Sequence, residues 1–170
     1  MHNWQDFVQD YSVREPGRGT ASVNLAEAVH GFFANGGRSC LVVGTDGASP
    51  AAYTAALAAL EGPDEVNIVV VPDLWQIEDD APAIAKAVAG HCVRMGNRMA
   101  VLHPKQAATP AEAEKAPALF ALDDTESQFT TLYYPWVNVP GVGGSARVVP
   151  PSGHVAGIWA RTDADRGVHR

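Results

Sequence analysis

Short apolar runs alternate with helix-favouring segments along this chain, and that alternation constrains the fold more than any other feature. The runs at 39–44, 66–71 and 99–103 are rich in β-branched residues and lack polar alternation, as buried strands do. A segment with apolar residues at helical spacing precedes each run. Helices between successive strands give right-handed crossovers and a parallel sheet. The sequence therefore predicts an α/β fold with a mostly parallel sheet flanked by helices on both faces.

Local signals place the ends of the predicted helices. Asn24 is expected to cap the first, with Glu27 three residues on to reciprocate the cap, and Asn-Gly-Gly at 35–37 ends it. Ser-Pro at 49–50 starts the second helix, since proline is favourable at the first helical position. Asp80 is expected to cap the third helix, and a glycine at 96 ends it.

The length of 170 residues suffices for one well-buried core, so a single domain is expected. Pro110 and Pro117 interrupt an alanine- and charge-rich stretch, for which no more than a helical turn or two is predicted. The expected parts are an opening segment at 1–22, alternating helix and strand units at 23–104, an irregular insertion at 105–126, and a strand and closing helix, capped by Ser152, at 127–170.

Charge and hydropathy exclude two classes of partner. The net charge is −7, the pI is near 5.2 and the basic residues are scattered singly, which disfavours nucleic acid as a partner. No apolar run approaches the roughly 20 residues of a membrane span. The polar, acidic start of the chain lacks the apolar core of a signal peptide, so neither a transmembrane segment nor a signal peptide is expected.

The metal-ligating residue types show no ligand spacing. Cys40 and Cys92 lie far apart, and both are expected to be reduced core residues. The six histidines show no paired spacing on one helix face, and none lies beside a cysteine pair. The sequence therefore predicts no metal site and no cofactor.

Three residues form the best enzymatic candidate. Asp46, Asp73 and His103 each follow a predicted strand, so they are expected at one edge of the sheet, where α/β proteins bind ligands. No Gly-x-Ser-x-Gly elbow supplies a nucleophile. An α/β hydrolase-like enzyme is the alternative function. A weaker alternative is small-molecule binding by the loop at 44–49, which lacks the phosphate-loop and dinucleotide-loop signatures.

Three stretches of sequence carry a resemblance to a known family. They read LYYPWVNVP at 132–140, VVPPSGHVAGIWARTDADRGV at 148–168 and NLAEAVHGFFANGG at 24–37. Together they resemble the tail sheath proteins of contractile phages and related injection machines. The long block at 148–168 is the most specific of the three.

The resemblance implies a structural protein with a subtilisin-like, three-layer sheath domain and no catalytic activity, since a fold analogy does not carry activity. It implies self-assembly into hexameric rings that stack as a helical sheath around an inner tail tube protein, above a baseplate. Contraction of such a sheath drives the tube through a membrane. The expected location is a virion tail or a phage tail-like particle assembled in the cytoplasm.

An aromatic cluster, Tyr133, Tyr134 and Trp136, is the candidate intersubunit contact, with core packing as the alternative. Sheath subunits of this family continue into a C-terminal domain with arms that exchange strands between neighbours. This sequence stops at Arg170, so that domain and those arms are expected to be absent. The chain by itself is then expected to be a monomer or a weak oligomer.

Overall fold

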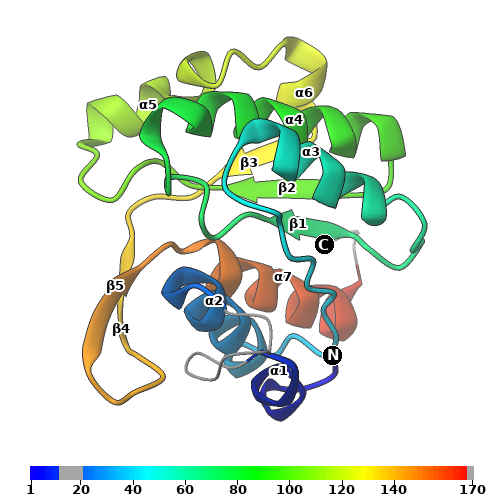
Figure 1. Ribbon diagram of the computed structural model, residues 1–170, viewed down its shortest axis with the longest axis vertical. Helices are drawn as coiled ribbons and strands as arrows, with labels where there is room; N and C mark the ends of the chain where they lie inside the picture. The colour runs from blue at the N-terminus through cyan, green and yellow to red at the C-terminus, as the bar shows by residue number, and fades with distance from the viewer. Residues whose placement is uncertain (12–20, 168–170) are drawn as a thin grey trace. The chain divides into compact units, whose positions relative to one another are not determined.

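The structure, a computed structural model, describes residues 1–11 and 21–167. The chain divides into two compact units. The terminal unit combines Met1–Val42 with Trp136–Arg170, and the central unit is the continuous stretch Val43–Pro135. Helices make up about half of the described chain, and the strands are short (Figure 1). The chain therefore has a mixed helix and sheet fold.

The central unit contains a three-stranded parallel sheet with the order β1-β2-β3. Its strands are β1 (Ile68–Val70), β2 (Met99–Leu102) and β3 (Thr130–Leu132). The register aligns Ile68 with Met99 and Ala100 with Thr130. The predicted runs at 66–71 and 99–103 thus contain strands, and β3 lies in the part of the chain at 127–170 for which a strand was predicted.

Two helix boundaries of the central unit follow the predicted signals. In α3 (Pro50–Ala59), Ser49 Oγ accepts a hydrogen bond from the Ala52 N–H at 3.3 Å. After α4 (Ala81–Met95), Gly96 has a φ of 69°, a left-handed conformation that glycine adopts without strain. Asp80 occupies the N-cap position of α4, but its side chain makes no capping hydrogen bond. A short 3₁₀ helix, Glu78–Asp80, precedes α4.

The core of the central unit lies between α3, α4 and the sheet. Its largest fully buried apolar side chains come from separate elements, which packing brings together. They are Leu74, Ile84, Val88, Leu102 and Phe120, and Cys92 is buried among them. Cys92 is a free thiol, as predicted, and burial raises its pKa to about 12.

The strand predicted at 39–44 is not formed. Cys40 exchanges two backbone hydrogen bonds with Met1, both at 3.0 Å, and no ladder continues from them. Leu41 is 48% exposed. The chain passes from the terminal to the central unit between Val42 and Val43, so this apolar run connects two units and is not buried in one sheet. Cys40 is a free cysteine but only partly buried.

The irregular insertion predicted at 105–126 is also wrong, because two helices form there. They are α5 (Pro110–Leu119) and α6 (Asp124–Gln128). Each begins with a capping box, formed by Thr109 with Glu112 and by Asp123 with Glu126. Pro117 lies two residues before the end of α5, where the helix can lose a hydrogen bond and still persist. A capping box at the start of a helix therefore outweighs a proline near its end.

The terminal unit contains three helices and an antiparallel hairpin. They are α1 (Trp4–Asp10), α2 (Val23–Ala34) and α7 (Ser152–Arg166), with β4 (Val137–Pro140) paired to β5 (Ala146–Val149). The sequence did not predict α1. Ser22, not Asn24, caps α2, because Ser22 Oγ accepts from the Leu25 N–H at 2.9 Å. Pro151, not Ser152, is the N-cap residue of α7, and it makes no side-chain cap.

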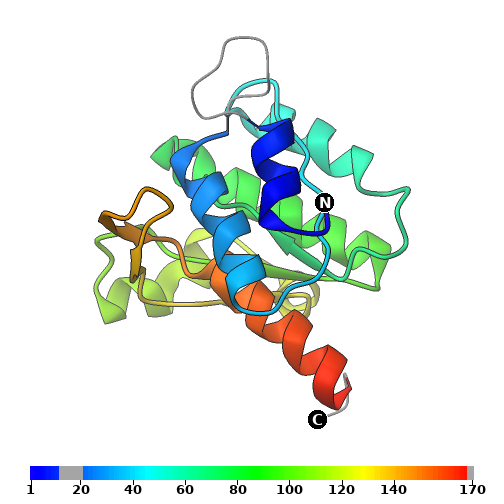
Figure 2. The ribbon, with the colours of Figure 1, turned by 90° about the horizontal axis from the view of Figure 1, so that it is seen from below.

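Helix α2 packs closely against the first part of α7, and Figure 2 shows the end of α7 extending beyond α2. A Cβ atom at Gly153 would lie 2.6 Å from Cα of Ala28, and one at Gly157 would strike the carbonyl oxygen of Phe32. Both obstacles are backbone atoms, so they cannot move aside cheaply. The two glycines on α7 therefore permit the short distance between the helices. No helix among the described residues is both long and apolar enough to cross a membrane.

Replacing Gly157 by alanine tests this packing. We expect Gly157→Ala to lower the free energy of unfolding by about 1–3 kcal/mol, because the added methyl group must push the two helices apart. Gly90→Ala on α4 is the matched control, since a Cβ there meets its nearest atoms at 3.8 Å. It should raise the free energy of unfolding by about 0.5–1 kcal/mol through helix propensity. Urea titration followed by far-UV circular dichroism measures the free energy of unfolding of both variants. Equal changes in the two variants would contradict the packing argument.

Candidate functional site

The predicted aromatic contact lies where the chain leaves the central unit. The Tyr133 N–H donates to the Leu102 carbonyl oxygen at 3.0 Å and so extends the pairing of β3 with β2 by one residue. Tyr134 is 39% exposed, and the Tyr134–Pro135 peptide bond is cis. Tyr133 and Trp136 are half-buried. Tyr134 is therefore the most exposed member of the cluster.

The three candidate catalytic residues lie in unequal environments. Asp46 is exposed in the loop before α3, and Asp73 is half-buried in the turn after β1. His103 follows β2 and is fully buried. Its carbonyl oxygen accepts a hydrogen bond from Trp75 Nε1 at 2.8 Å. Its backbone thus anchors Trp75.

Burial lowers the pKa of His103 to about 4, because the charged ring would lose its hydration. A base with that pKa is neutral and weak at neutral pH, and a ring at 0% exposure is closed to a substrate. The described residues contain no group of three or more His, Cys, Asp or Glu side chains able to hold a metal ion. The geometry therefore gives no support to the hydrolase alternative.

Glu27 has a role that the sequence did not indicate. It was expected to close the cap of its helix, yet its side chain is 3% exposed and accepts a hydrogen bond from the Val142 N–H at 2.9 Å. Arg147 Nε lies 3.7 Å from the same carboxylate oxygen. A Cβ at Gly141 would approach that oxygen to 2.8 Å, so glycine leaves room for the carboxylate. Glu27 therefore holds the β4–β5 turn against α2.

His154 forms a polar contact between α7 and the end of α2. Asn35 Nδ2 donates to the Gly31 carbonyl oxygen at 2.8 Å and lies 3.2 Å from His154 Nδ1. Because an amide nitrogen only donates, Nδ1 accepts, and the proton of the neutral ring lies on Nε2. Burial lowers the pKa of His154; His30 lowers it further and Glu27 opposes both. The neutral ring is the form that this contact requires.

Arg98 is the buried cation of the central unit, at 2% exposure. Its guanidinium donates to the carbonyl oxygens of Leu60 at 2.7 Å and Pro63 at 3.4 Å, and to Asn97 Oδ1 at 3.0 Å. It also lies 3.3 Å from His91 Nε2, which must accept because guanidinium has no acceptor. Burial lowers the pKa of His91, as does the charge of Arg98. Arg98 thereby ties the loop after α3 to the end of α4.

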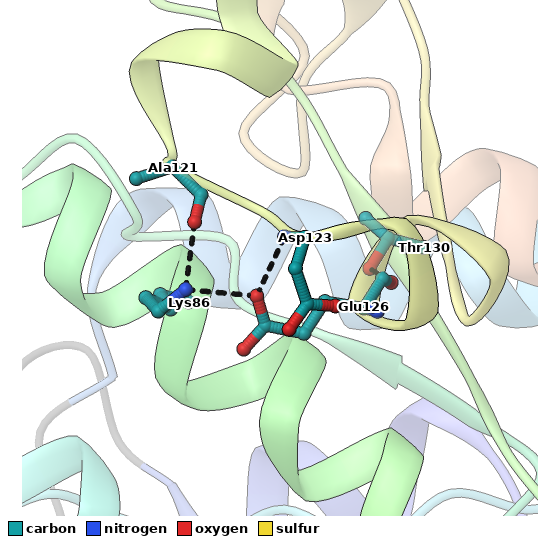
Figure 3. A network of polar contacts seen from close by, with 5 residues as sticks. All are labelled: Lys86, Ala121, Asp123, Glu126 and Thr130. Atoms are coloured by element: carbon teal, nitrogen blue, oxygen red, sulfur yellow. Dashed lines mark hydrogen bonds and ion pairs between the residues drawn. The ribbon is translucent and has the colours of Figure 1, made fainter.

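A network on the surface of the central unit joins α4 to α6 (Figure 3). Lys86 Nζ donates to the Ala121 carbonyl oxygen at 2.7 Å and to Glu126 Oε2 at 2.9 Å. The same Glu126 oxygen accepts from the Asp123 N–H at 3.0 Å, and Thr130 Oγ1 donates to the Glu126 carbonyl oxygen at 2.8 Å. The network fixes α6 at the start of β3.

The chain belongs to the phage tail sheath protein family: a sequence model of the phage tail sheath protein central domain matches residues 46–170. This match confirms the resemblance stated from the sequence. A comparison with curated proteins found no match.

Two solved structures share the fold. One is the helical sheath of the anti-feeding prophage in its contracted state, with a TM-score of 0.64 and 20% identity over 100% of this chain and 42% of that chain. The other is the six-fold symmetrised anti-feeding prophage baseplate, with the same TM-score and identity over 98% of this chain and 42% of that chain. This chain therefore spans less than half the length of those two.

The burial of His103 predicts a pH dependence of stability. The pKa of the ring is 6.5 in the unfolded chain and about 4 in the folded chain, so the unfolded state binds more protons between these values. The free energy of unfolding therefore falls as the pH falls through this window, by on the order of 3 kcal/mol for this group. Urea titrations at several pH values across this window should show that the free energy of unfolding falls less steeply for His103→Gln than for the wild type. A ring titration near 6.5 by NMR in the folded protein would contradict the prediction.

Proposed function

We propose that this chain is a sheath-forming part of a contractile tail sheath subunit. The family match over residues 46–170 carries the proposal, and the fold shared with a contracted sheath and a baseplate supports it. In this proposal the subunits form hexameric rings that stack around an inner tail tube and rest on a baseplate. The sheath belongs to a phage tail or a phage tail-like particle, and its contraction drives the tube through a membrane.

Contraction of a polymer requires subunits that change their contacts with one another without unfolding. Energy for such a change comes from the difference in free energy between two packings of the subunits, so no nucleotide or cofactor is needed. The close packing of α2 on α7 and the buried bonds of Arg98 would let each unit move as a rigid body. We therefore assign this chain no enzymatic activity.

The proposal extends to the layering and the contact surface. A subtilisin-like arrangement, with helices on both faces of the parallel sheet and no catalytic set, fits the short central sheet and the burial of His103. Tyr133, Tyr134 and Trp136 form the proposed intersubunit contact. Tyr134 is the strongest candidate among them, because an exposed aromatic ring gains the most area on association.

Electron microscopy of the full-length protein that contains this chain tests the function. We expect rings or sleeves at high protein concentration, since the assembled sheath is a polymer of this subunit. Co-expression with a tail tube protein should yield sleeves of uniform diameter. Dispersed particles under both conditions would contradict the proposal.

Substitution of Tyr134 tests the contact surface. In the full-length protein, Tyr134→Ala should reduce sleeve formation, because the exposed ring is lost from the interface. Ile77→Ala, which truncates a side chain that is 44% exposed elsewhere in the central unit, is the control and should assemble normally. Pelleting by ultracentrifugation measures the polymer fraction. Equal pelleting of Tyr134→Ala and wild type would remove Tyr134 from the contact.

A further inference from the structure

Strand β3 has an open edge. It is the last strand in the order β1-β2-β3, and no other described strand pairs with it. The Ala100 N–H donates to the Phe129 carbonyl oxygen, and the Tyr133 N–H donates to the Leu102 carbonyl oxygen. In a parallel pair this pattern directs the N–H and C=O of Thr131 toward β2. The N–H and C=O groups of Thr130 and Leu132 therefore point toward the open edge.

An apolar groove lies beside this edge. It has a volume of about 90 Å³, below the roughly 150 Å³ of a cavity that holds benzene, so it suits one aliphatic side chain. Thr130 and Leu132 contribute to its wall, so the residues with outward backbone groups also line it. The complete lining is Pro117, Phe120, Leu122, Ser127, Thr130 and Leu132.

The segments around the groove are acidic. From Pro110 to Leu132 the chain carries five carboxylates and one lysine, and Lys86 of α4 pairs with one of these carboxylates, that of Glu126. Glu114 precedes the groove residue Pro117 by three positions on α5, and Asp124 precedes Ser127 by three positions on α6, so each lies one helical turn from the groove. Both are exposed. The groove therefore has a negatively charged rim.

These three features together define a peptide-binding edge. An extended segment that adds to a sheet gains main-chain hydrogen bonds, and a pocket for alternate side chains selects its sequence. We propose that β3 and the groove bind an extended, basic segment of a partner protein. Its backbone pairs with Thr130 and Leu132, one aliphatic side chain enters the groove, and lysine or arginine on either side meets the acidic rim. This proposal does not depend on the sheath function.

A labelled hexapeptide of sequence KTLTVK, with blocked ends, is the probe for the 170-residue chain. Fluorescence anisotropy should show saturable binding that weakens when the salt concentration rises from about 0.1 M to 1 M, because salt screens the charges. The peptide ETLTVE is the charge-reversed control and should bind at least several-fold more weakly. Equal affinities for the two peptides would overturn the proposal that the partner segment is basic.

Two variants on α6 separate the groove from the rest of the surface. Ser127→Trp places a large ring in the groove and should weaken KTLTVK binding roughly tenfold or more, since the aliphatic side chain can no longer enter. Gln128→Trp is the matched control on the next exposed position and should leave binding within about twofold. Equal affinities of the two variants would overturn the groove as the binding site.

Amide hydrogen exchange tests the strand pairing. On peptide binding, the amides of Thr130 and Leu132 should gain protection, while the amide of Thr131 is already protected by its bond to β2. Unchanged exchange at Thr130 and Leu132 would overturn edge pairing. Sedimentation of the chain without peptide provides a last check. If the chain self-associates and Ser127→Trp abolishes this, the occupant of the groove is a second copy of the chain. That result would contradict the proposal of a basic partner segment.

Discussion

The close approach of α2 and α7 is the contact on which the terminal unit depends. Gly157 lets the two helices meet at backbone distance, and a side chain at that position would separate them. The same α2 carries Glu27, which holds the β4–β5 turn through the Val142 N–H. One helix therefore positions both the hairpin and α7. Segments more than a hundred residues apart in sequence come together in this unit, and two glycines of α7 allow their close approach.

The fold could be predicted where its signals are local. The start of α3 at a Ser-Pro pair and the end of α4 at Gly96 need only neighbouring residues, and both were predicted. The run at 39–44 has the composition of a strand, but its burial depends on which unit it joins. The α5 segment shows the opposite error, because a capping box at Thr109 outweighs a proline in the last turn. Composition alone could resolve neither segment.

The polar contacts could not be predicted, because their partners are distant in sequence. Glu27 stands three residues after Asn24, so a capping box was the natural local interpretation. Its observed partner is the backbone of Val142, 115 positions away. Arg98 appeared as one of several scattered cations, and only folding surrounds it with carbonyl oxygens. Family resemblance did identify the segments that form α2 and α7, and the aromatic contact remains a prediction.

Buried polar groups make these packings specific. If α2 shifted by one residue against the hairpin turn, Glu27 would lose the Val142 N–H and remain buried without a donor, at a cost of several kcal/mol. Arg98 imposes the same condition on the loop after α3, because its guanidinium must keep its carbonyl acceptors. A purely apolar interface would lack this added cost of an unsatisfied buried group. In a polymer whose subunits exchange one set of neighbours for another, this internal penalty would confine the change to the surfaces between subunits.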